Sequence, residues 1–213
     1  MFRRKKADEP VEPDAATPEP DAPAGPRAQG PWDVSEVTLE EEGGDRVDLG
    51  SLLITPHDAL DLQLQVDEAS GQVIAVILAG ETGAVELRAF AAPRHGDIWD
   101  GVRRQVAGEV ARMGGTATEV EGPWGTEVKV SLTVTRDDGQ RVQQASKVVG
   151  IPGPRWLLRA TLFGRPAVEY DEAGDVETAL RDVVVVRGGS PIPPGDALPL
   201  TMPPNARRMD GEA

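Results

Sequence analysis

Residues 126–135 read TEVKVSLTVT, and this stretch decides how the ordered part of the chain is organised. Apolar residues occupy every second position, a period typical of a strand with one buried and one solvated face: Val128, Val130, Leu132 and Val134. An Asp-Gly pair follows at 138–139, and such a pair between two β-like runs is the strongest short signal of a hairpin. We therefore predict antiparallel strands at 126–135 and 141–150.

The pattern continues on both sides of this hairpin. The run 155–163 has a wholly apolar face and a mixed face that carries two arginines, which predicts a central strand partly covered on both faces. Arg155 and Arg159 would lie about 13 Å apart along such a strand, too far for both to hold one phosphate. An earlier group of strands is predicted at 61–66, 73–80 and 83–90. The sequence thus indicates two groups of antiparallel strands.

A helix is predicted between these groups, over DIWDGVRRQVAGEVARMGG at 97–115. Asp97 is a suitable N-cap. Apolar residues recur at steps of three and four and share one face: Ile98, Val102, Val106, Val110 and Met113. Gly101 and Gly108 lie nearly on one face, and we expect them to let the helix approach the sheet closely.

The remaining segments complete one α+β domain over 32–190. A second helix begins near Asp175, and the β-branched run 183–186 either ends that helix or forms a strand. Residues 1–31 are rich in Pro, Ala, Asp and Glu, a composition that predicts disorder. Residues 191–213 are rich in proline and predict an extended segment, part of which lies on the domain.

The composition narrows the function classes. The 213 residues include no cysteine, two histidines and a formal net charge of −14. These numbers exclude disulfides and thiolate nucleophiles, disfavour a zinc site, and argue against binding to nucleic-acid phosphates. No apolar run approaches the ~20 residues that span a bilayer, and no secretory signal follows the charged start. We expect a cytoplasmic protein without a metal or other cofactor.

The residues that could carry a function are few. Our candidates for partner or anion binding are Trp32, Trp124, Arg94, His95, Arg155 and Arg159. Arg94 and His95 precede the first helix, where a helix N-terminus would attract an anion; an ordinary loop histidine is the alternative. His57 and Asp58 could form a base–carboxylate pair, but no nucleophile motif accompanies them. We assign no catalytic residue and no metal ligand.

Three tryptophans follow a Gly-Pro pair directly or one residue later: Trp32, Trp124 and Trp156. Proline fixes the direction in which the chain enters a strand, and the ring then anchors it. Packing inside the fold is therefore our main interpretation. The alternative is that an exposed pair of these rings forms an interaction hot spot.

Four stretches together resemble a known family: GPWD at 30–33, RVDLGSLLITP at 46–56, GPRWLLRATLFG at 153–164 and SPIPPGDALPLTMPP at 190–204. They are similar to an actinobacterial family of conserved proteins described only as a domain of unknown function. The resemblance implies a soluble, cytoplasmic, single-domain protein, often encoded near a dUTP-hydrolysing enzyme, with no catalytic residues to assign. The strand–helix order also resembles a PsbP/Mog1-like α/β/α sandwich, a fold used for docking to partners.

Two functions follow from these patterns. The first is a non-enzymatic protein-interaction module that docks to a protein partner whose identity the sequence leaves open, as it does the oligomeric state. The alternative is an anion- or nucleotide-binding protein, or an enzyme, that uses strand arginines and a loop histidine. A pocket that joins a histidine to a strand arginine would favour the alternative. A flat face with exposed Trp32 or Trp124 would favour the first.

Overall fold

The computed structural model describes residues 27–38, 46–136, 138–204 and 206. Most of the segment for which the composition predicts disorder, 1–31, lies outside these ranges. Among the helices of the described residues, none is long and apolar enough to cross a membrane. The described chain has a mixed α+β fold, which confirms the predicted fold class.

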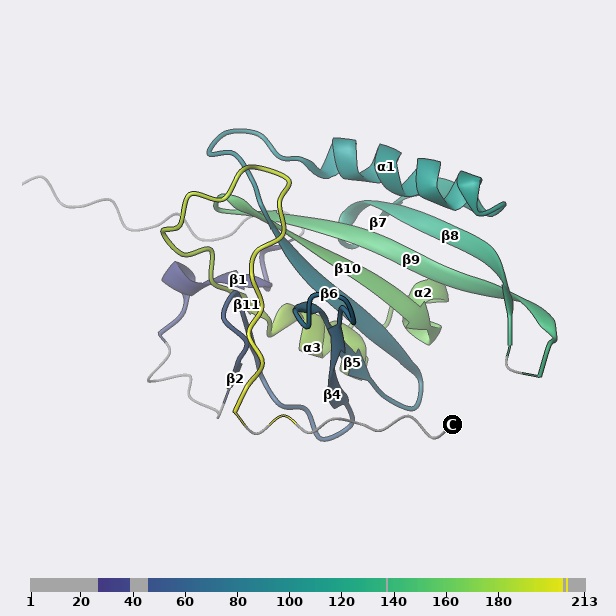
Figure 1. Cartoon of the computed structure of the whole chain (residues 1–213), viewed down its shortest axis with the longest axis horizontal. Coiled ribbons are helices and arrows are strands. Elements are labelled where there is room, and N and C mark those ends of the chain that lie inside the picture. Colours follow the sequence, from purple (N-terminus) through teal and green to yellow (C-terminus); the bar gives the residue numbers. More distant parts are fainter. Residues whose placement is uncertain (1–26, 39–45, 137, 205, 207–213) are drawn as a thin grey trace, which may run out of the picture.

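A seven-stranded antiparallel sheet forms the centre of the fold (Figure 1). Its strands run in the order β4-β5-β6-β10-β9-β8-β7, with the bounds β4 Asp61–Val66, β5 Val73–Ala79, β6 Gly83–Ala91, β7 Thr116–Gly122, β8 Gly125–Thr135, β9 Arg141–Gly153 and β10 Trp156–Gly164. The run predicted as a central strand is β10, which pairs with β6 on one side and β9 on the other.

The two predicted groups of antiparallel strands are both present, and they form one sheet. β6 pairs with β10 along its whole length, from Trp156 opposite Ala91 to Gly164 opposite Gly83, and this pairing joins both groups into one sheet. Periodicity identifies strands but carries no information on which strand lies beside which. The edge strand β7 was missed, because its apolar residues Ala117 and Val120 are three positions apart and give no period of two.

A second, small sheet lies on one face of the large one. It has the order β1-β11-β3-β2, and its strands are β1 Trp32–Asp33, β2 Val47–Asp48, β3 Leu52–Ile54 and β11 Val184–Val185. Strands of two or three residues show no measurable period, so the sequence predicted none of them except as an alternative for 183–186. That run contains the strand β11 and does not extend the preceding helix.

The helices lie on opposite faces of the large sheet (Figure 1). α1 (Trp99–Arg112) packs on the face that we call the outer face, against β7, β8 and β9. On the inner face lie α2 (Arg165–Val168), α3 (Asp175–Arg181) and the small sheet, while the 3-10 helix η2 (Val34–Glu36) follows β1. Because α1 covers only part of the outer face, the side of the sheet formed by β4, β5 and β6 is left partly open there.

Details of α1 correct three sequence expectations. The helix begins at Trp99 after an Ile98 N-cap, although the Asp97 carboxylate still accepts the N–H of Trp99 at 2.9 Å. Gly101 and Gly108 face solvent with no atom within 4 Å of their Cβ positions, so they do not mediate a close approach to the sheet. Met113 is 63% exposed, since the helix ends before it can pack.

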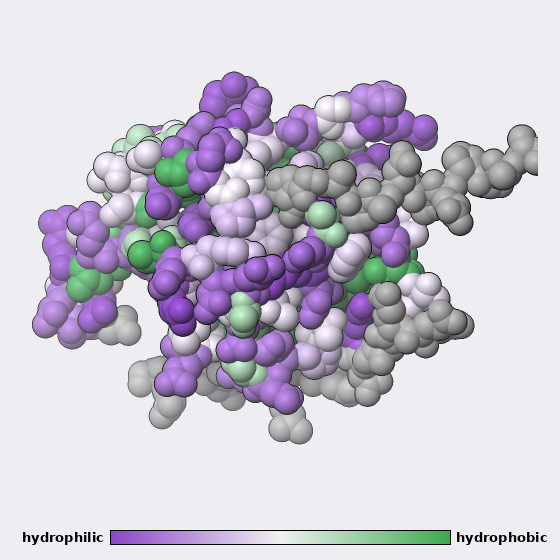
Figure 2. Space-filling view, turned by 180° about the vertical axis from the view of Figure 1, so that it is seen from behind, coloured by the Kyte–Doolittle hydropathy of each residue, from purple (hydrophilic) through white to green (hydrophobic). Residues whose placement is uncertain are grey.

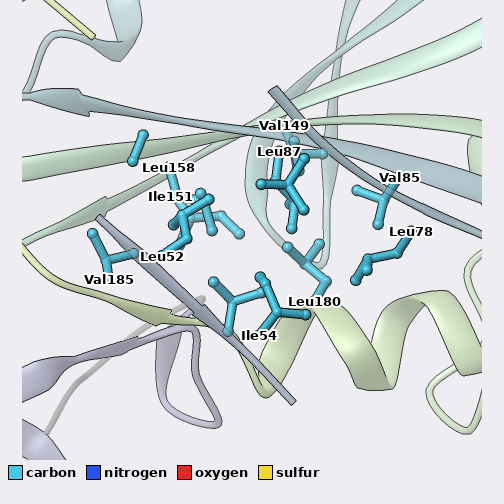
Figure 3. Packing of buried hydrophobic residues seen from close by; sticks show 14 of the residues in the cluster. Leu52, Ile54, Leu78, Val85, Leu87, Val149, Ile151, Leu158, Leu180 and Val185 are labelled. Carbon is cyan, nitrogen blue, oxygen red and sulfur yellow. The ribbon is translucent and has the colours of Figure 1, made fainter. Parts of the chain in front are cut away.

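Two buried clusters hold these layers together. The inner cluster joins the large sheet to α3 and the small sheet, and Figure 3 shows Leu180 of α3 and Leu52 of β3 facing Leu87 and Leu158 of the sheet. The outer cluster packs the apolar face of α1 against β8, β9 and β10. Burial of this apolar surface supplies the main stabilising free energy of the fold.

The predicted extended C-terminal segment does lie on the fold over part of its length. Ala197 forms a β-bridge with Phe90 and Leu200 forms one with Gly50. Leu198 lies between them and is 3% exposed, in the inner cluster. This segment therefore fixes the end of the sheet at which β6 leads into α1.

Candidate functional site

Hydrophilic side chains predominate on the face of the molecule shown in Figure 2, and apolar residues occur there in small separate groups. Large exposed apolar patches are what usually mark a protein interface. On this face, a binding surface must therefore be sought in the arrangement of charges. Two groups of arginines stand out, one on the outer face of the large sheet and one at the turn between β9 and β10.

The first group lies on the part of the outer face that α1 leaves open, which we call the open sheet face. Its side chains are half-buried and come from four neighbouring strands: Gln63, Ile77, Glu86, Arg88, Arg159 and Thr161. The register places Arg88 of β6 directly opposite Arg159 of β10. Like charges at opposite positions repel, so this pair costs stability unless a counter-charge is present.

Glu86 supplies that counter-charge for both arginines. Arg88 Nε donates to Glu86 Oε1 at 2.9 Å, and Arg159 Nη2 lies 3.8 Å from the same oxygen. The Arg159 guanidinium also lies over the Phe90 ring, 5.5 Å from its centroid. One carboxylate thus serves two guanidinium groups, and the nearer of them takes the hydrogen bond.

The electrostatic balance at Arg159 remains unfavourable. Burial lowers the pKa of Arg159 most, and repulsion from Arg88 lowers it further, while the attraction of Glu86 and Glu109 is weaker. The side chains of Arg159 and Arg88 are still 21% and 28% exposed. Another carboxylate or a phosphate could therefore reach this pair and relieve the repulsion.

The second group, which we call the turn cluster, consists of Arg94, His95, Arg155 and Arg187. Arg155 lies in the β9–β10 turn, and its carbonyl oxygen accepts the N–H of Ala92 at 2.9 Å and Arg187 Nε at 3.1 Å. Arg94 and His95 follow Ala92 closely in the exposed loop that leads to α1. Three of the residues predicted as binding candidates are thus brought to one end of the sheet, while Arg159 lies apart from them on the outer face.

Two of the predicted tryptophans pack inside the fold. Trp124 is 4% exposed in the β7–β8 turn and belongs to the inner cluster. Trp156 is completely buried, and its Nε1 donates to Asp33 Oδ2 at 2.7 Å while Arg27 lies 5.4 Å from its ring centroid. Trp32 is half-buried in β1. Trp124 is therefore not exposed on a flat face, and both Trp124 and Trp156 pack in the interior.

The fourth tryptophan, Trp99, was not singled out in the sequence. Its Nε1 donates to the carbonyl oxygen of Thr126 at 2.8 Å, and its ring lies against Gly150 of β9, where a Cβ atom would not fit. Gly153 lies beneath Trp156 in the same way. Glycine inside a strand often marks such a close approach, and this was the available sequence signal.

His57 is close to Asp175, not paired with Asp58 as one interpretation of the sequence allowed. Its Nε2 lies 3.9 Å from Asp175 Oδ1, at the start of α3. It lines an apolar pocket of about 90 Å³ together with residues such as Leu60 and Leu62. None of the candidate arginines lines this pocket, so it does not join a histidine to Arg155 or Arg159. Within the described ranges, no group of three or more potential ligand side chains is arranged to hold a metal ion.

Arg88 is the functional candidate that sequence reasoning missed. Its position in the run GAVELRAF shows only that it alternates with apolar residues. Its significance comes from the strand opposite, and the pairing of β6 with β10 crosses about 70 residues of sequence. The sequence signal that pointed toward this pair was the prediction of 155–163 as a central strand with an arginine on its mixed face, and it did not identify Arg88 as the neighbour of that arginine.

Comparison with known proteins identifies a family without an assigned activity. A family model described as "Protein of unknown function (DUF3710)" matches residues 30–209. The match covers most of the chain, so the chain belongs to this family. The matched region contains the four stretches that carry the resemblance to a domain of unknown function. A search of curated proteins found no significant match.

Proposed function

We propose that this member of a family of unknown function is a non-enzymatic protein-interaction module, and that its partner binds the open sheet face through a carboxylate. The observation that supports this most directly is the Arg88–Arg159 pair, in which two opposed guanidinium groups share one carboxylate. A second carboxylate, supplied by an aspartate or glutamate of the partner, would complete the pairing.

The composition of the open sheet face also fits a protein partner. Arg159 and the β-branched Ile77 lie on this face, and the Phe90 ring under the Arg159 guanidinium packs against the outer cluster beside it. Protein interfaces are enriched in arginine and aromatic residues relative to the remaining surface. Arg159 is already partly desolvated, so less hydration is lost when a partner covers it than for a fully exposed arginine.

The geometry of guanidinium groups explains why a carboxylate is the expected group on the partner. A guanidinium donates two parallel N–H bonds to a carboxylate, and such charge-assisted bonds are stronger than neutral ones. Each contributes about 1.5–3 kcal/mol. The pair is thus able to select an acidic segment on a partner even though the chain as a whole is acidic.

This proposal can be tested by quantitative affinity capture with the full chain and three variants. Arg159→Gln and Arg88→Gln remove one guanidinium each, and Arg141→Gln removes an exposed arginine from the distant β8–β9 hairpin as the matched control. We expect the same discrete partner to be lost about tenfold or more from both face variants and retained by the control. Capture that is equal in all four chains would contradict the proposal, as would a turnover assay in which the chain processes a nucleotide such as dUTP.

Several finer expectations belong to the same proposal. They are a cytoplasmic location, an actinobacterial origin with a dUTP-hydrolysing enzyme encoded nearby, one domain over 32–190, and function without a cofactor. What supports them is the composition and the resemblance carried by the four quoted stretches. The alternative function, anion binding by arginines and a loop histidine, is favoured by the gathering of Arg94, His95 and Arg155 at the turn cluster.

A further inference from the structure

We propose that the turn cluster binds a phosphate group, with Arg155 and Arg94 as the main donors and His95 beside them. This inference goes beyond the protein-interaction role, and it concerns a surface different from the open sheet face. It rests on the backbone conformation of Arg155, on the lack of a partner for its side chain among the described residues, and on the arginines near it.

Arg155 occupies a turn position that favours glycine. Gly153 pairs with Trp156, so Pro154 and Arg155 are the two central residues of the β9–β10 turn. Proline first and a positive φ second is the pattern of a type II turn, in which glycine is preferred at the second position. Arg155 has φ 63°, whereas every other positive φ found in the described residues belongs to a glycine.

This conformation costs free energy that the fold does not recover through the Arg155 side chain. The backbone of Arg155 does contribute to the fold, because its carbonyl oxygen accepts hydrogen bonds from the Ala92 N–H and from Arg187 Nε. Glycine would offer the same carbonyl oxygen without the steric cost. Within the described part of the chain, the Arg155 guanidinium takes part in no hydrogen bond and no ion pair. Strained residues of this kind gather at functional sites, where the side chain serves a ligand.

Among the described residues, neither Arg155 nor the arginines nearest to it, Arg94 and Arg187, form an ion pair. Within the described ranges, the Arg187 guanidinium donates to the main-chain carbonyl oxygens of Arg155, Ser190 and Ile192. Arg94 and His95 are exposed in the adjacent loop. The arginines that do form ion pairs among the described residues are Arg27, Arg88, Arg103, Arg159 and Arg165. In a chain with a net charge of −14, arginines that form no ion pair among the described residues can attract an anion.

A phosphate group suits this arrangement better than a single carboxylate. Its three terminal oxygens can accept from donors on separate loops, and the Ala92–Arg155 backbone bond brings the loops of Arg94 and Arg155 together. Planar guanidinium groups also match the geometry of a phosphate. The cluster lies on an exposed end of the sheet, so the group could belong to a small soluble molecule or to a lipid headgroup. Both sources offer the same phosphate chemistry to the cluster.

The test is isothermal titration calorimetry on the full chain with inorganic phosphate, with pyrophosphate, and with vesicles of anionic phospholipid beside zwitterionic ones. Arg155→Gly is the decisive variant because it removes the ligand side chain while it relieves the backbone strain. We expect saturable binding to a phosphate compound or to the anionic vesicles, weakened at least tenfold in Arg155→Gly and unchanged in the Arg141→Gln control. The melting temperature of Arg155→Gly should equal or exceed that of the natural chain.

The calorimetric results distinguish a soluble phosphate ligand from a lipid headgroup, and both from the absence of a site. Binding to phosphate or pyrophosphate identifies a soluble ligand, and binding to anionic vesicles alone identifies a headgroup; each supports the site if Arg155→Gly abolishes it. Binding that Arg155→Gly leaves intact would overturn the proposal, and so would the absence of saturable binding in every arm. A lower melting temperature of Arg155→Gly would remove the strain argument on which the proposal stands.

Discussion

Arg88 and Arg159 lie directly opposite each other on β6 and β10, and both are directed to the same oxygen of Glu86. The pair is near the centre of the large sheet, at the junction between its two groups of strands. Glu86 offsets the repulsion between the two guanidinium groups and so stabilises the sheet. The two arginines can still bind a further anion.

Replacement of Glu86 by glutamine should therefore destabilise the protein. The change leaves two opposed guanidinium groups with no carboxylate between them, and we expect a loss of about 1–2 kcal/mol in the free energy of unfolding. Urea unfolding at low and high salt measures it, and added salt should restore part of the loss because it screens the repulsion. A second change, Arg159→Met, should recover stability in the Glu86→Gln background; additive effects of the two changes would contradict this account.

Trp156→Ala should be among the most damaging substitutions. Trp156 is fully buried, and truncation of such a residue costs about 3–5 kcal/mol, a large part of the usual 5–15 kcal/mol of domain stability. Trp156→Phe is the informative companion, because it keeps an aromatic ring but leaves the Asp33 carboxylate without its indole donor. Chemical denaturation provides the comparison, and a loss below about 1 kcal/mol for Trp156→Ala would show that the ring is not buried.

The buried ion pair between Lys147 and Glu127 leads to a third prediction. Lys147 Nζ lies 3.4 Å from Glu127 Oε2, and Glu127 also accepts the N–H of Trp124 at 3.1 Å. Lys147→Met alone leaves a buried carboxylate without its cation and should cost about 3–5 kcal/mol. Lys147→Met combined with Glu127→Gln should recover much of that loss in thermal or urea unfolding. Equal stability of the single variant and the natural chain would mean that the pair is not buried.

Two glycines should respond to alanine in opposite ways. Gly108→Ala on the exposed side of α1 meets no atom within 4 Å and should stabilise the protein by about 0.5–1 kcal/mol through helix propensity. Gly150→Ala should destabilise it, because the new methyl group would meet the Trp99 ring. Melting temperatures of the two variants test this directly, and shifts in the same direction would contradict the packing of α1 described above.

The accuracy of the sequence predictions followed the length of each element. The long strands β8, β9 and β10 were found close to their true bounds, β8 from its alternation and β9 and β10 from the turn residues that flank them. The small sheet was missed because its strands contain too few residues for a period to show. The place of α1 and its apolar face were predicted, but the role given to Gly101 and Gly108 was wrong, since both glycines lie on the solvent side of the helix.

The candidate site was only partly predictable for a related reason. Arg155 and Arg159 could be chosen from one strand, and Arg94 from the loop before a helix, because each is unusual in its local sequence. That Arg155 approaches the loop of Arg94 depends on a hydrogen bond between residues 92 and 155, and that Arg159 meets Arg88 depends on strand register. Neither relationship leaves a trace in local composition or periodicity.

The central claim is that a partner covers the open sheet face, and site-specific photo-crosslinking from Thr161 tests it most directly. Thr161 is half-buried on that face, two residues from Arg159, whereas Gln143 on the exposed β8–β9 hairpin provides a control position. A photoreactive residue at 161 should give one discrete protein adduct in native cells, which is lost when Arg159 is changed to glutamine, while the same residue at 143 should give none. Adducts that are equal at both positions, or an adduct at 161 that persists with Arg159→Gln, would contradict the claim.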